Sequence, residues 1–211
     1  MRSRTTRRVG AIALALAIWI GAAGLATARD YESGFGFGIS VPDAWLVLTR
    51  GEVEKHADLF LENEGSPALR SVSPGMRQIV YDRVRRGELE IFYRQEGVFG
   101  GFVDNVNIML QSAQLPGTPD QLKGLCRVLP SEFSRLFGRP IAMDGCEMRE
   151  RAGRSALYLQ FDGAIPGTTT LQYQLPQYGD ATLVITATAE DTNLPRLLGE
   201  FEQIIASIRM H

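Results

Sequence analysis

Few residues in this 211-residue chain have the types and spacing that chemistry needs. The best polar group is Asp104, Asn105 and Asn107, which follows Gly100 and Gly101. Carboxylate and amide oxygens gathered at a cleft could hold a metal ion or take part in acid–base catalysis. The competing interpretation is that these side chains cap a turn where a strand begins. We treat the three residues as a possible polar cleft.

The two histidines do not predict a hydrolytic or metal site. His56 lies among Glu54, Lys55 and Asp58, a pattern typical of an exposed helix, and His211 is the last residue. Nucleophilic catalysis usually pairs a nucleophile with a histidine base, and structural zinc needs a ligand spacing that is missing here. No G-x-S-x-G, phosphate-loop or H-E-x-x-H motif occurs. We therefore predict a non-enzymatic protein without a metal or other cofactor.

Cys126 and Cys146 are the only cysteines. If the chain is exported, one disulfide between them is the simplest assignment. Closing a loop of about 20 residues would stabilise the fold by roughly 3 kcal/mol in the chain-entropy model. Two buried free thiols are the alternative, and a C-x-x-C redox motif is absent.

The N-terminus predicts that export. Four arginines within residues 1–8 precede an apolar run at 9–25, and the Ala-Thr-Ala of 26–28 has the small side chains of a cleavage site. We expect a signal peptide, 1–28, cleaved after Ala28, and a single domain, 29–211, that is periplasmic or secreted. An uncleaved membrane anchor is the alternative.

Charge and residue type narrow the choice of partner. Without residues 1–28, 18 Lys and Arg face 24 Asp and Glu, which gives no electrostatic case for nucleic acid or an anionic membrane. Arginine and tyrosine often anchor protein interfaces. The possible partner surface comprises Arg83, Arg85 and Arg86 near a predicted helix end, and Tyr173 and Tyr178 around a hairpin. Arginines that simply stabilise a solvated helix end are the competing interpretation.

Apolar periodicity predicts the elements that position these residues. Period-two alternation favours strands at 34–41, 45–49, 88–95, 102–110 and within 141–188. Helical spacing favours helices at 52–63, 74–86, from 118 onward with a kink or break at Pro130, and at 194–208. One apolar stripe per helix and short hairpins imply an α+β fold, a largely antiparallel sheet with helices packed on both faces. The stripe of the last helix, with Phe201, is expected to be buried.

Three segments together resemble the PsbP-like superfamily, which includes DcrB-like envelope proteins. Residues 36–45 (GFGISVPDAW) are similar to its opening strand, proline and tryptophan, 104–108 (DNVNI) to its central strand, and 181–188 with 201–208 to its last strand and helix. The resemblance implies an α/β/α sandwich that binds partners. We therefore expect an exported partner-binding or assembly accessory whose partner is an envelope protein. A periplasmic small-molecule or lipid-binding module is the alternative.

Overall fold

The computed structural model describes residues 27–56, 66–96 and 102–211. In this part of the chain the strands pair antiparallel in two sheets, a seven-stranded sheet of order β3-β4-β5-β9-β8-β7-β6 and a three-stranded sheet of order β1-β2-β10. The strands are β1 Ala28–Ser33, β2 Phe37–Pro42, β3 Trp45–Leu48, β4 Glu90–Arg94, β5 Asn105–Ser112, β6 Met143–Arg151, β7 Arg154–Asp162, β8 Thr168–Pro176, β9 Ala181–Glu190 and β10 Arg209–Met210. The helices are α1 Arg50–Lys55, α3 Pro67–Ser71, α4 Pro74–Arg85, α5 Pro119–Phe137 and α6 Leu194–Ala206.

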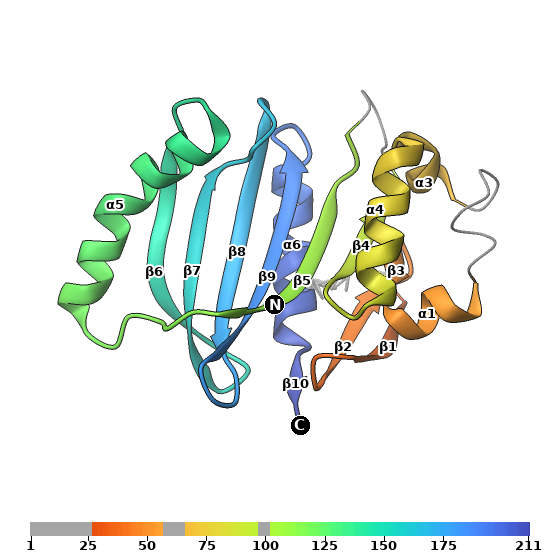
Figure 1. The fold of residues 1–211 in the computed structure, drawn as a ribbon, viewed down its shortest axis with the longest axis horizontal. Coiled ribbons are helices and arrows are strands. Elements are labelled where there is room, and N and C mark those ends of the chain that lie inside the picture. The colour runs from red at the N-terminus through yellow and green to blue at the C-terminus, as the bar shows by residue number, and fades with distance from the viewer. Residues whose placement is uncertain (1–26, 57–65, 97–101) are drawn as a thin grey trace, which may run out of the picture.

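Helices cover both faces of the large sheet, as the sequence predicts (Figure 1). On one face α6 packs beside the small sheet, and the two share a single apolar core. On the other face α4 lies near β4, while α5 lies over β6 and β7 at the opposite edge (Figure 1). Among the described residues, no helix lies in front of β5, β9 and β8 between α4 and α5, although the link from β5 to α5 crosses the sheet near one end of these strands (Figure 1). The architecture is α+β, with an open antiparallel sheet.

The core under α6 is made by alternate residues of the strands. Successive side chains point to opposite faces of a sheet, so only one parity of each strand contacts the helix. On β8 this parity is Leu171 and Tyr173, and on β9 it is Leu183 and Ile185, all of which are buried. The side chain of Phe201, which is 2% exposed, fills the centre of the helix face. α6 is therefore a structural element.

A partly buried ion pair orients α6 on the sheet. Arg94 on β4, whose side chain is 5% exposed, donates from Nε to Glu200 Oε2 at 3.1 Å and from Nη2 to Glu200 Oε1 at 3.0 Å. The indole N–H of Trp45 donates to the same Glu200 Oε2 at 3.0 Å. Two parallel guanidinium bonds fix both the distance and the direction of the carboxylate. The pair therefore sets the rotation of α6 relative to β3 and β4.

Local signals account for the helix ends. The side chains of Ser73 and Thr118 cap α4 and α5. Each accepts a hydrogen bond from the backbone N–H three residues later, and each is followed by a proline. α5 ends at Gly138, whose φ of 68° suits glycine. Pro130 lies inside one continuous helix and does not divide it. The expected helix 52–63 is described only as α1, because residues 57–65 lie outside the described part.

Replacing Phe201 with Ala is expected to lower the free energy of unfolding by about 3–5 kcal/mol, because a large ring leaves the core and a cavity remains. The matched control is Leu198→Ala on the same helix, since Leu198 is 39% exposed and should cost far less. Urea unfolding of both variants measures the difference. Equal losses in the two variants would contradict the assigned orientation of α6.

Candidate functional site

The uncovered strands carry a surface that we call the central polar face. It consists of alternate residues of β5, β9 and β8. Its half-buried polar residues are Asn105, Asn107, Thr186, Thr188, Gln172 and Gln174, and the apolar Met109 and the buried Val184 lie in the same surface, in one row with Gln174. Strand register places Asn107 opposite Thr186 and Thr186 opposite Gln172, so these three side chains form one row across the sheet. All six polar residues are half-buried and neutral. The row continues into apolar residues on both sides, Ile91 of β4 and Leu159 of β7, where the helices begin to cover the sheet.

Hydrogen bonds between side chains order this surface. Gln174 donates to Gln172 Oε1 at 2.7 Å, and Gln172 donates to Thr186 Oγ1 at 3.0 Å. Further along, the hydroxyls of Thr170 and Thr188 lie 3.3 Å apart. The Asn107 carboxamide makes no hydrogen bond with any described residue. The face therefore has a fixed arrangement of amides and hydroxyls with hydrogen-bonding capacity left over.

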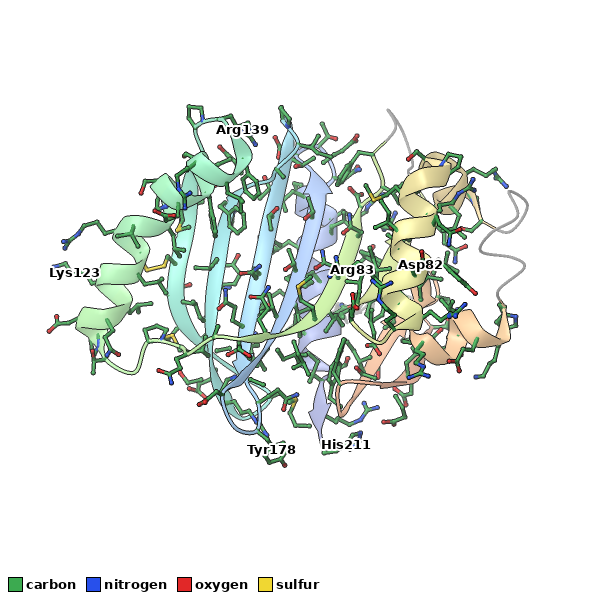
Figure 2. The ribbon with its side chains drawn as sticks, viewed as in Figure 1. Asp82, Arg83, Lys123, Arg139, Tyr178 and His211 are labelled. Carbon is green, nitrogen blue, oxygen red and sulfur yellow. A yellow bond between two sulfur atoms is a disulfide. The ribbon has the colours of Figure 1, made fainter. Side chains whose placement is uncertain are left out.

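Apolar residues project from the helices beside the face. On α4, Met76 is 51% and Ile79 56% exposed. Figure 2 shows Arg83 on the side of α4 toward β5 and Asp82 farther from β5. On α5, Val128 and Leu136 are also exposed. The surface thus combines a neutral polar floor with exposed aliphatic groups on the flanking helices.

A disulfide fixes α5 to the sheet. Cys126 on α5 and Cys146 on β6 are bonded, with their Cα atoms 5.8 Å apart, which confirms the predicted pair. No side chain of α5 is fully buried, although its apolar stripe contacts Leu157, Leu159 and Phe161 of β7. Packing alone therefore holds this helix less firmly than it holds α6. The disulfide supplies a covalent constraint at the middle of α5.

The structure separates the three residues of the predicted polar cleft. Asp104 is buried, and its carboxylate accepts bonds from the Glu190 N–H at 2.9 Å and the Asn193 side chain at 3.0 Å. It therefore anchors the turn between β9 and α6. Asn105 donates to the Val103 carbonyl at 2.9 Å and caps the strand entry, while Asn107 lies on the central polar face. The turn-capping interpretation describes Asp104 and Asn105 better than the cleft does.

The predicted arginine surface is a helix end with internal ion pairs. Arg86 Nε lies 2.6 Å from Glu88 Oε1, and Arg83 Nε lies 3.8 Å from Glu88 Oε2. Arg85 is exposed. Only Arg83 lies on the side of α4 that faces β5 (Figure 2). The three arginines therefore do not act as one anion-binding group.

The assignment of Tyr173 to a partner surface is wrong. Its side chain is 0% exposed because it lies on the face of β8 that packs against α6, between Leu171 and Leu175. The Tyr173 hydroxyl donates to Glu202 Oε1 at 2.8 Å and accepts from Arg151 at 2.9 Å. Tyr178, in the turn after β8, is exposed, and its hydroxyl donates to the His211 carbonyl at 2.9 Å. The two tyrosines thus belong to different environments.

Sequence analysis missed a buried carboxylate on β4. Glu90 accepts the Ser33 hydroxyl at 2.7 Å and the Gly34 N–H at 2.8 Å, which ties the β1–β2 hairpin to the large sheet. Burial raises the pKa of Glu90, and the two hydrogen bonds lower it in part. Burial likewise raises the pKa of Asp104. Both groups have structural partners, and we assign neither a chemical step.

Two further properties concern the described residues alone. They contain no group of three or more His, Cys, Asp or Glu side chains placed to hold a metal ion. Among the helices described, none is both long enough and apolar enough to cross a membrane.

The sheet covered on both faces places this chain among the α/β/α sandwiches. Cyanobacterial PsbP (CyanoP) from Synechocystis sp. PCC 6803 is similar in structure, with a TM-score of 0.51 and 11% identity over 90% of this chain and 96% of that one. The chain therefore has the PsbP-like fold, which confirms the resemblance seen in the sequence.

Two other solved structures align more loosely. LpqN of Mycobacterium tuberculosis, involved in cell envelope biogenesis, has a TM-score of 0.48 and 14% identity over 87% of this chain and 90% of that one. The Ran-binding protein Mog1p of Saccharomyces cerevisiae has a TM-score of 0.49 and 7% identity over 87% and 95%. No family model and no curated protein matches the sequence. Identities this low show the fold alone.

Removing the disulfide with Cys126→Ala and Cys146→Ala together is expected to lower the free energy of unfolding by roughly 3 kcal/mol. Hydrogen exchange should rise more in α5 than in α4, because α5 has no fully buried side chain. Denaturant titration and amide exchange measure the two effects. Reductant should destabilise the wild type and leave the double variant unchanged, and a wild type insensitive to reductant would contradict the prediction.

Glu90→Gln is expected to change how stability depends on pH. Because the folded state raises this pKa, it holds the proton more tightly than the unfolded state. The contribution of Glu90 to stability is therefore fully present at low pH, and it is lost as the pH rises above the ordinary pKa of a glutamate. Gln keeps the shape without the charge: its carbonyl oxygen can accept the Gly34 N–H, and its NH₂ can donate to the Ser33 hydroxyl. The stability of the variant relative to wild type should therefore increase as the pH is raised from about 4 toward neutrality. Urea unfolding at several pH values in this range measures the stability difference. Glu54→Gln is the control, because Glu54 forms an exposed ion pair with Arg50. Parallel stability–pH curves for Glu90→Gln and wild type would contradict the prediction.

Proposed function

We propose that this protein is an exported, non-enzymatic accessory of the cell envelope that binds a protein partner through the central polar face. The observation that carries the proposal is the uncovered row Asn107–Thr186–Gln172, with ordered amides and exposed aliphatic residues beside it. A face that combines hydrogen-bonding groups with flanking apolar groups has the composition of a protein interface.

Export is supported by two independent features. The N-terminal pattern is that of a secretory signal. The Cys126–Cys146 disulfide is a bond that persists mainly in oxidising compartments. Both features favour a periplasmic or secreted location. The fold similarity shows the type of scaffold and does not identify a partner.

The space under α6 does not favour a lipid or small-molecule carrier. An apolar cavity there, lined by residues such as Trp45, Leu171 and Phe201, has a volume of about 10 Å³. Such a volume is at the lower limit for a single water molecule, whereas drug-sized ligands occupy several hundred Å³. A carrier that used this space would have to separate α6 from the sheet and break the Arg94–Glu200 pair.

A photocrosslinking residue at Gln174, incorporated in the cells that produce the protein, tests the proposal. We expect a discrete crosslinked envelope protein, because Gln174 lies on the proposed interface. The matched control is the same residue at Leu198, which is exposed on α6 on the other face of the sheet. Mass spectrometry identifies the product. Crosslinks from position 198 and none from position 174 would assign the interface elsewhere and overturn the proposal.

A further inference from the structure

We propose that the central polar face binds an uncharged, extended segment of the partner polypeptide, whose main-chain amides are held by the carboxamides of Asn107, Gln172 and Gln174. This inference rests on the proposed function and specifies the chemistry of the bound segment. It is carried by the neutrality of the face, by the geometry of its amides and by the residues that flank it.

The neutrality of the face selects against a charged occupant. The chain is 22% Asp, Glu, Lys and Arg, yet none of the six polar residues of the face is charged. A charged group placed here would lose water without gaining a counter-charge, which is costly. On the flanking α4, Arg83 lies on the side toward β5, and its Nε is already 3.8 Å from Glu88 Oε2. Charge complementarity therefore favours a neutral segment.

The carboxamides match the hydrogen-bonding groups of a peptide. Each Asn or Gln side chain presents one carbonyl acceptor and an NH₂ donor, the same pair that a peptide group offers. Gln172 and Gln174 are held in place by their bonds to each other and to Thr186, so binding would not need to order them. Asn107 makes no hydrogen bond to the described residues and is available.

The spacing of the row suits an extended chain. Asn107 and Gln172 are separated by two strand spacings, roughly 10 Å. An extended peptide covers this distance with about three residues. A segment that crosses the strands can therefore reach both carboxamides with peptide groups about three residues apart.

The flanking residues favour a polypeptide over a glycan. Met76 and Ile79 expose aliphatic side chains on α4, the helix that flanks the face, and Ile79 lies one turn before Arg83. Aliphatic groups pack well against the apolar side chains of a peptide. None of the six polar residues of the face is aromatic, so the face itself offers no ring for a sugar to stack on.

The test uses the purified exported protein and a phage-displayed library of random 12-residue peptides, followed by synthetic copies of the enriched sequences. We expect enriched peptides with an uncharged centre, and a central Asp or Lys should weaken binding at least tenfold. Asn107→Ala and Gln172→Ala should each weaken binding about tenfold, the value of one hydrogen bond. The control Gln78→Ala, on the Asp82 side of α4, should leave affinity unchanged.

Several outcomes would overturn the inference. These are enrichment of charged peptides, enrichment of none, or unchanged affinity in the Asn107→Ala protein, which loses no internal hydrogen bond. Tetra-N-acetylchitotetraose is the glycan probe. If it shifts the NMR signals of the Asn107 and Gln172 side-chain amides and the peptides do not, the inference is also overturned. Melting temperatures establish that each variant is folded. A crosslink at Gln174 together with failure of the peptide test would leave the proposed function standing and remove only this inference.

Discussion

Burial of α6 on one face of the seven-stranded sheet requires that one parity of β5, β9 and β8 be apolar along its length. Ile108, Ile185 and Tyr173 are of this parity, and each is fully buried. The other parity is then free to be polar, and it forms the central polar face, in which Met109 and Val184 are the apolar members. A one-residue slip of β8 would place Gln172 under α6 and Tyr173 outside. The same register therefore determines both the core and the candidate binding surface.

Polar groups on the buried face make that register specific. Arg94 and Glu200 join β4 to α6, and Arg151, Tyr173 and Glu202 join β6 and β8 to the same helix. The Arg149 guanidinium carbon lies 3.4 Å from the centre of the Tyr158 ring and continues this network along β6 and β7. Among these groups the Arg94 side chain is the buried one, at 5% exposed, so loss of Glu200 would leave a buried charge without compensation. α6 is thus held in one position by directional bonds as well as by apolar packing.

Sequence periodicity predicted the elements whose apolar residues alternate cleanly, such as β8, β9 and α6, while the expected export and the presence of only two cysteines predicted the disulfide. It missed β1, because Arg29 to Ser33 is a polar edge strand whose partner β2 supplies the apolar residues. It misplaced Asp104, because the donors that bury this carboxylate are 86 and 89 residues away. Tyr173 already alternated with Leu171 and Leu175, and that parity was the signal for its burial. The polar alternates of the three central strands were visible in the same way, but which of them stay uncovered depends on where distant helices pack.

The width of the sheet explains why an uncovered face exists. Seven strands at ~4.8 Å span roughly 29 Å, and a helix with its side chains is roughly 10–12 Å wide. α4 and α5 pack at opposite edges, so together they leave the central strands without a helix (Figure 1). An apolar surface at that position would promote aggregation, whereas charged residues would lose hydration without gaining a counter-charge when a neutral segment binds. Neutral amides and hydroxyls satisfy both conditions, since they keep the exposed sheet hydrated when free and can exchange water for peptide groups on binding.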